Sequence, residues 1–481
     1  MANGIADSTA NGAPNGAPNG APNGATDKGN SRRIWGWWWF DWANQPYNTL
    51  LLTFIFAPYF AASVAPDPVT GQALWGWMNF AAGLAIALFA PILGAIADNT
   101  GPKRPWILFW SLLYFIGAWA LWWAVPGADS NTIFWVLVAF GVGMVGLEYG
   151  IIFTNAILPT LGSKAEIGRI SGSGWAFGYL GGLAALAIML LFLAENEQGF
   201  TLIGLEPLFG LDAAAREGTR SVGPFTALWY LVFVIPFFLW VREPAKQAPI
   251  SSNAIRAGLA DLGRTLKALP RQRSLLAYLG SSTFYRDALN GIYAFGGIYA
   301  AGVLGWSIIQ IGVFGILAAT VGAIGCWFGG RADRRFGPKP VIITCILVLI
   351  VVCTIIISTD RSMILFMPVA AGSSAPDTLF YFCGCLIGAS GGAVQAASRT
   401  MMVRQANPER MTEAFGLYAL SGKALSFMAP GLIALATTVS GSQRLGVSPL
   451  IGLFLIGLVL LIWVKPEGES SETWQAERPS S

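Results

Sequence analysis

Histidine is absent from the 481 residues of this chain, and charged residues make up only 11 % of them. Soluble globular proteins carry about 25 % charged residues, so this composition excludes a soluble enzyme. Without histidine the chain lacks the commonest metal ligand and general base, and we expect no metal, no cofactor and no catalytic residue. The 29 basic and 25 acidic residues leave a net charge of +4, too low for a nucleic-acid-binding surface.

Cysteine is also scarce, with five residues that lie in apolar stretches of the second half. An odd number without paired spacing argues against a disulfide framework, and we expect packing thiols. What the chain has in quantity is hydrophobic residues, at 54 %. This balance is typical of a multi-pass membrane protein.

Twelve apolar runs are long enough to cross a bilayer, which takes about 20 residues. They lie near 36–64, 74–97, 105–125, 131–158, 171–194, 223–241, 274–300, 307–328, 340–358, 377–399, 414–440 and 447–464. We therefore expect an all-α membrane protein with these domains: a disordered Asn/Gly/Ala/Pro-rich tail (1–33), a six-helix bundle (34–241), a cytoplasmic linker (242–273), a second six-helix bundle (274–464) and a polar tail (465–481).

The basic residues indicate the orientation of the helices in the membrane. With the N-terminus in the cytoplasm, 23 Lys and Arg residues, Arg399 among them, fall on the cytoplasmic side and four on the other. The excess predicts that both termini are cytoplasmic, in the cell (inner or plasma) membrane. The linker contains an amphipathic stretch, which fits either a helix on the membrane surface or a solvated linker.

One turn occurs twice, after the second helix and after the eighth. Each copy has a glycine four residues before an aspartate, then a second glycine and basic residues. Equivalent copies 235 residues apart indicate two related six-helix bundles. We expect the turns to stabilise one conformation through close helix contacts, and the residues concerned are Gly94, Asp98, Gly101, Lys103 and Arg104 in the first copy and Gly329, Asp333, Arg334, Gly337 and Lys339 in the second.

This double turn resembles the signature loop of the major facilitator superfamily, with Asn99 where a basic residue is usual. Further motifs are similar to the vacuole-effluxer-like (autophagy-related amino-acid exporter-like) family: Phe40–Tyr47, Asn155–Pro159, Gly174–Gly182, Gly391–Arg399 and Phe415–Lys423. The resemblance covers residues 36–464. It implies two pseudo-symmetric six-helix bundles, transport by alternating access, and export of a small solute such as an amino acid.

Ionisable residues inside a membrane are costly and usually functional. Glu148, Arg286, Asp287 and Lys423 lie at similar depth on three helices, and their formal charges cancel. By helical spacing Asn290 shares a face with Arg286, while Asp41 and Asn44 form a polar stripe on the first helix and Gln395 lies on the tenth. We expect these eight residues to bind the substrate or a coupling proton. A purely structural set of ion pairs holding the bundles together is the alternative.

The sequence thus predicts a monomeric, proton-coupled secondary transporter, with a small solute, protons and the lipid bilayer as its partners. Uniport is an alternative mechanism. A non-transporting receptor or a lipid scramblase on the same fold is the alternative function.

Overall fold

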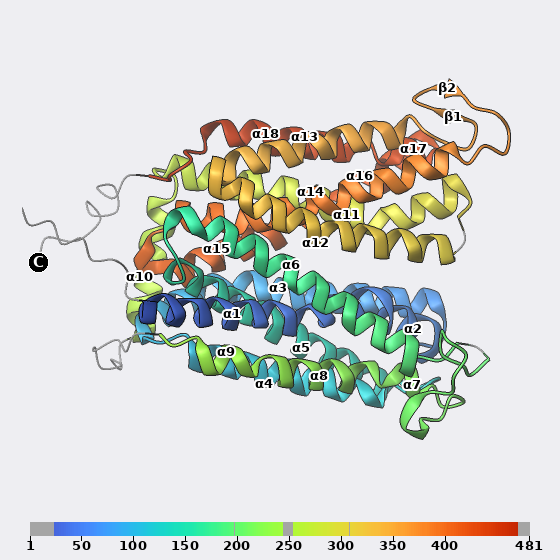
Figure 1. Ribbon diagram of the computed structural model, residues 1–481, viewed down its shortest axis with the longest axis horizontal. Coiled ribbons are helices and arrows are strands. Elements are labelled where there is room, and N and C mark those ends of the chain that lie inside the picture. The colour runs from blue at the N-terminus through green and yellow to red at the C-terminus, as the bar shows by residue number, and fades with distance from the viewer. Residues whose placement is uncertain (1–23, 197, 244–253, 307, 470–481) are drawn as a thin grey trace, which may run out of the picture.

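The computed structural model describes residues 24–196, 198–243, 254–306 and 308–469. Long helices run side by side along one direction, and the first described helix begins at the end of the molecule where the last described residues also lie (Figure 1). We call this the predicted cytoplasmic end. The tail expected over 1–33 lies partly outside the described residues, and its last ten residues, 24–33, belong to the first helix.

The first half of the chain supplies six crossings. Pro46 precedes a π-helical turn in the first crossing, which also has a break at Ile55. The elements are α1 (Gly24–Pro46), η1 (Tyr47–Phe54), α2 (Phe56–Tyr59), η2 (Phe60–Val64), α3 (Pro68–Thr100), α4 (Arg104–Trp119), η3 (Ala120–Trp123), α5 (Ser130–Ile157), η4 (Leu158–Thr160), α6 (Lys164–Ile188), η5 (Met189–Leu193), η6 (Leu208–Gly210), α7 (Glu217–Arg220), α8 (Val222–Phe233) and α9 (Ile235–Trp240).

A short helix, α10 (Ala254–Ala268), separates these crossings from the second six. The second half contains α11 (Arg273–Leu304), α12 (Ile308–Phe336), α13 (Pro338–Ile357), β1 (Met363–Ile364), β2 (Met367–Pro368), α14 (Ala375–Gln405), η7 (Pro408–Arg410), α15 (Met411–Ala424), α16 (Met428–Ser440), α17 (Gln443–Gly446), α18 (Pro449–Leu460) and η8 (Leu461–Trp463). The two strands form an antiparallel hairpin.

Eleven helical stretches in the described residues are long and apolar enough to cross a membrane. The twelfth crossing is α11, which is also long but carries Arg286 and Asp287 in its middle. All twelve expected helices are therefore present. Within each half the helices pack mainly on one another, for example α4 on α5 and α12 on α14, while α6 packs on α12 and α3 on α15 between the halves.

Large apolar side chains cover much of the outside of the bundles. On α3, for example, Leu84, Leu88 and Phe89 are each about half exposed. Such a surface suits contact with lipid tails rather than water. All five cysteines are free, and four of them are buried, as expected for packing thiols.

Candidate functional site

The eleventh crossing is broken in the middle of the bundle. α15 ends at Ala424 and α16 begins at Met428, because Pro430 has no N–H and its ring clashes with a helical carbonyl one turn earlier. Asp287 of α11 stabilises the new helix start, since its Oδ2 accepts a hydrogen bond from the N–H of Ala429 at 2.8 Å. Asp287 is 2 % exposed, and its Oδ1 has no hydrogen-bond partner among the described residues.

Lys423, in the last turn of α15, pairs with a residue of the other bundle. Its Nζ lies 3.0 Å from Oε1 of Glu148 on α5, and both side chains are about a quarter exposed. The lysine also complements the negative end of the α15 dipole. The structure thus brings together two of the four predicted central charges.

Arg286 and Asp287 are neighbours in sequence but not partners in space. Successive residues of an α-helix point about 100° apart, and the Arg286 guanidinium instead donates to the carbonyl of Tyr418 at 3.1 Å and lies 4.2 Å from the centre of its ring. Gly422 makes room for it, because a Cβ there would meet the guanidinium at 2.6 Å. Within the described chain Arg286 has no carboxylate in ion-pair contact.

A second polar cluster lies around Arg399 of α14. This guanidinium, 4 % exposed, lies 3.2 Å from Oδ2 of Asp41 and 3.2 Å from Oδ1 of Asn155, and it donates to Ser171 on α6. It also lies 4.4 Å from the ring centre of Trp37. Arg399 therefore joins the two bundles from inside, and counting it among the cytoplasmic basic residues was wrong.

The remaining predicted polar residues do not join these clusters. Asn290 is exposed, and buried Asn44 has no partner for its amide nitrogen in the described part of the chain. Gln395 lies within hydrogen-bonding reach of Tyr179 on α6, which also contacts Tyr293. Sequence reasoning missed Tyr179 and the role of Arg399. Tyr179 has no formal charge that would mark it as a site residue, and Arg399 was counted as a cytoplasmic basic residue that indicates membrane orientation.

The first copy of the repeated turn makes the contacts that its residue types predict. Asp98 lies at the start of α15, where its carboxylate accepts hydrogen bonds from the N–H groups of Glu413 at 2.9 Å and Thr412 at 3.3 Å, and Lys103 lies 3.3 Å away. Gly94 permits this approach, because a Cβ there would meet the carbonyl of Thr412 at 2.6 Å.

The other two residues of this copy act within the first bundle. Arg104 donates to the carbonyl of Phe238 and, through its N–H, to Glu243 at 2.9 Å. Gly101 has a φ of +105°, a conformation that favours glycine.

The second copy is less well bonded. Asp333 is 1 % exposed and lies against Gly168 of α6, but neither carboxylate oxygen has a hydrogen bond of normal geometry in the described residues, and the nearby Thr400 hydroxyl donates to Ala396. The glycine that faces the other bundle is Gly330. A Cβ added at this position would lie 2.7 Å from the carbonyl oxygen of Gly168.

The other predicted residues of the second copy serve their own bundle. Gly329 packs on Ala393 of α14, and Lys339 donates to the carbonyl of Val464 at 2.7 Å. Gly337 has a φ of +85°, and Arg334 is exposed.

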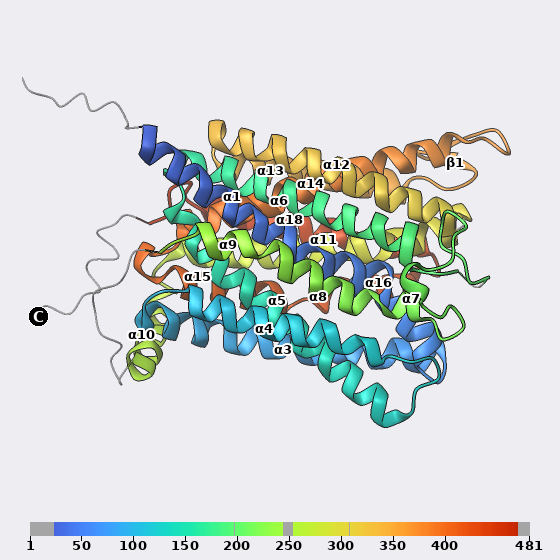
Figure 2. The same cartoon turned by 60° about the horizontal axis from the view of Figure 1, so that its bottom comes forward.

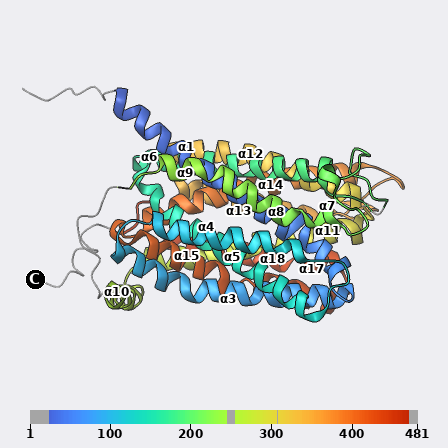
Figure 3. The same ribbon diagram turned by 90° about the horizontal axis from the view of Figure 1, so that it is seen from below.

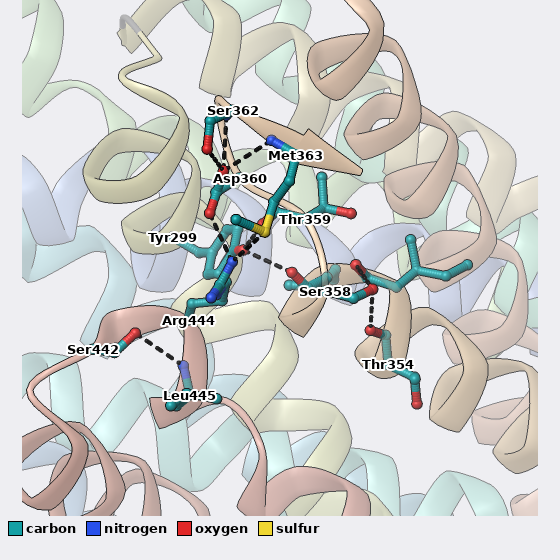
Figure 4. A network of polar contacts seen from close by, with 12 residues as sticks. Tyr299, Thr354, Ser358, Thr359, Asp360, Ser362, Met363, Ser442, Arg444 and Leu445 are labelled. Atoms are coloured by element: carbon teal, nitrogen blue, oxygen red, sulfur yellow. Dashed lines mark hydrogen bonds and ion pairs between the residues drawn. The ribbon is translucent and has the colours of Figure 1, made fainter. Parts of the chain in front are cut away.

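Polar contacts between the bundles are concentrated from the predicted cytoplasmic end to the middle. At the opposite end, the described ion pairs join elements of one bundle, as in Glu195 with Arg216. Another such network holds the hairpin loop to α17, where Arg444 lies 2.7 Å from Asp360 and close to Met363 (Figure 4). The bundles are thus fastened together at the predicted cytoplasmic end.

Comparison with known proteins agrees with this architecture. Residues 80–473 match the family model described as vacuole effluxer Atg22 like. An uncharacterized MFS-type transporter of Bacillus subtilis, YxiO, is 24 % identical over 449 residues, covering 91 % of this chain and 96 % of the relative. Autophagy-related protein 22 of Coccidioides immitis is 23 % identical over 312 residues; the match covers 61 % of this chain but only about half (47 %) of that relative.

Solved structures show the same fold at low sequence identity. The human organic anion transporter MFSD10 superposes with a TM-score of 0.66 at 17 % identity, covering 90 % of this chain and 99 % of that one. The proton:xylose symporter XylE gives a TM-score of 0.67 at 11 % identity, covering 91 % and 95 %. XylE is a protein of the major facilitator superfamily, and the predicted fold of twelve helices in two bundles is confirmed.

Proposed function

Since the chain belongs to the vacuole effluxer Atg22-like family of membrane transporters, we propose that it exports a small zwitterionic solute, such as an amino acid, by proton-coupled alternating access. The two bundles would separate alternately at either end around a site between α5, α11 and α15.

The observation that carries the substrate class is the state of Arg286. It is a guanidinium in the middle of a spanning helix whose nearest acidic neighbours are already engaged, Glu148 by Lys423 and Asp287 by the start of α16. Arg286 is partly buried, and a cation without a counter-charge is costly there, so a substrate carboxylate would be stabilised beside it. The Glu148–Lys423 pair, on α5 and α15, is about a quarter exposed, so Glu148 keeps carboxylate surface for a substrate amine.

Asp287 is the proposed carrier of the coupling proton. One of its oxygens bonds Ala429 and the other is buried without a partner in the described residues, which suits a carboxyl that holds a proton there. Glu148 suits this role less well in the present state, because its carboxylate is already engaged by Lys423.

Uptake of labelled amino acids into proteoliposomes, with and without a pH gradient, tests the proposal. Arg286→Gln should abolish uptake and Arg286→Lys should retain part of it, whereas Arg361→Gln, an exposed cation at the opposite end, should be neutral. Full uptake by Arg286→Gln would refute the assignment of the substrate site. No uptake by the parent protein, together with lipid movement between leaflets, would favour the scramblase alternative.

The coupling role is tested separately with Asp287→Asn, which keeps an oxygen to accept from Ala429 but cannot titrate. We expect it to fold and to exchange substrate across the membrane while losing acceleration by the gradient. If it still responds to the gradient as the parent does, Asp287 is only a helix cap.

The proposed location is the cell membrane with both chain ends in the cytoplasm. Reporter fusions at residues 130 and 255 should then report opposite sides, since those positions lie at the two ends of the bundle. Finding both on one side would refute the topology.

A further inference from the structure

The helix α10 lies across the predicted cytoplasmic end of the bundle rather than along it. It is seen nearly end-on in Figure 3, beside the end of α3, and it keeps this peripheral position in Figure 2. Gly258 sets the contact, because a Cβ there would lie 2.9 Å from the Ala95 carbonyl and the Ile96 Cα of α3. Leu262 is buried on the same side.

Polar residues on this inner side connect α10 to both bundles. Asp261 accepts a hydrogen bond from the side-chain amide of Asn99 on α3 at 3.0 Å, and it lies 3.5 Å from a guanidinium nitrogen of Arg410 just before α15. Arg410 also donates to the Thr265 hydroxyl at 3.0 Å. The helix thus bridges the two bundles directly beside the Asp98 contact. The short side-chain amide of Asn99 reaches Asp261 of α10.

An apolar stripe runs along α10 directly beside its inner side. Ile255, Leu259 and Leu266 are 60 %, 47 % and 48 % exposed, and at about 100° per residue they lie within roughly 40° of one another around the helix. Arg256 and Lys267 flank the stripe on its solvent side, and both are exposed. A helix transverse to the spanning helices, with an apolar stripe bordered by basic residues, has the pattern of one that lies in a membrane interface.

We propose that α10 binds the anionic surface of the cytoplasmic leaflet and thereby holds the gate at this end closed. The lipid-facing side of the adjoining α3, with Leu84 and Leu88 exposed, brings the bilayer next to the helix. Anionic headgroups attract Arg256 and Lys267 while the stripe enters the interface. Because Asp261 ties the same helix to Arg410, lipid binding stabilises the state in which α3 and α15 are together. This inference depends on the chain being a membrane transporter, not on the identity of its substrate.

Fluorescence quenching of the full-length protein in vesicles tests the lipid contact. An environment-sensitive probe is attached at Leu259→Cys, on the stripe, or at Ala257→Cys, about 160° away around the helix, each in a Cys385→Ser background. Spin-labelled phospholipid should quench the Leu259 probe more strongly, and adding phosphatidylglycerol to phosphatidylcholine vesicles should increase the difference. Equal quenching at the two positions would overturn the proposal.

The gate is measured by the distance between spin labels at Ser163→Cys and Phe336→Cys, which lie on different bundles at this end. Phosphatidylglycerol should raise the short-distance population. Each basic residue near an anionic surface contributes about a fivefold change in binding, so Arg256→Gln with Lys267→Gln should weaken the lipid response about 25-fold. Arg32→Gln with Arg331→Gln, which removes the same charge elsewhere at this end, should leave it unchanged.

Asp261→Asn separates lipid binding from gate control. In this variant, a probe at Leu259→Cys should still be quenched by the spin-labelled lipid. The spin-label distance across the gate should no longer respond to phosphatidylglycerol. A gate that ignores phosphatidylglycerol in the parent protein would refute the regulatory role, and an equal loss of response in the control variant would show that only overall charge matters.

Discussion

The contact between Asp98 and the start of α15 gives a quantitative prediction about the gate. Lys103 belongs to the same bundle as Asp98, so only the bonds to Thr412 and Glu413 are lost when the bundles separate. Replacing a capping side chain by alanine costs about 1 kcal/mol, and losing a carboxylate from a helix N-terminus costs about another 1 kcal/mol. Asp98→Ala should therefore shift the closed-to-open ratio by about 30-fold.

Asp98→Asn keeps an acceptor oxygen but loses the charge. We expect it to destabilise the closed state by about 1 kcal/mol, which lowers the closed-to-open ratio by a factor of about five. The assay is the spin-label distance between Ser163→Cys and Phe336→Cys, with substrate affinity within each state as a second readout. Asp333→Asn is the matched control: its carboxylate is buried without a normal hydrogen bond, so the amide should favour the closed state. Equal shifts in the same direction for both aspartates would refute the reasoning.

Three further outcomes follow from the contacts described. Glu148→Gln and Lys423→Gln should each lower the free energy of unfolding by about 1–3 kcal/mol, because a partly buried charge is left unpaired. The double variant should regain most of this loss, and a double variant as unstable as the single variants would contradict the reasoning. Gly94→Ala should open the gate in the spin-label assay, whereas Gly83→Ala, with open space around its Cβ, should not. Burial raises the pKa of Asp360, but the hydrogen bonds from Ser362 and the charge of Arg444 together lower it by more. The pKa of this carboxyl therefore lies below its ordinary value. The stability it contributes is therefore complete above the unfolded pKa, about 3.9, and is lost as pH falls through the lower folded pKa; acid melting curves of Asp360→Asn should lack this step.

Eleven of the twelve crossings could be predicted from length and hydropathy alone. The spacing of Gly94 and Asp98 places both at one helix end, and both contact the start of α15. The gating role of the turn stays a prediction. The spacing did not reveal that Gly330, and not Gly329, faces the other bundle, since that depends on how α12 is rotated about its axis.

The pairing of the central charges was the least predictable part. Sequence places Glu148, Arg286, Asp287 and Lys423 at similar depth, but which of them meet depends on the break before Pro430. That break leaves the N–H of Ala429 free to bond Asp287, while Arg286 donates to the carbonyl of Tyr418. Arg399 was misplaced for a related reason: charge counting treats an arginine near a helix end as solvated, whereas partners from three other helices can hold it inside.

The interrupted eleventh crossing also bears on how the chain enters the membrane during synthesis. A segment with a lysine beside three non-helical residues exposes peptide groups that lipid cannot satisfy, so it inserts poorly alone. Its stabilising partners, Glu148 and Asp287, are translated earlier and are in place when it emerges. We therefore expect the seventh crossing, which carries Asp287, to stay unpaired in the membrane until the eleventh crossing is synthesised. The site then forms only when the eleventh crossing inserts next to its earlier partners.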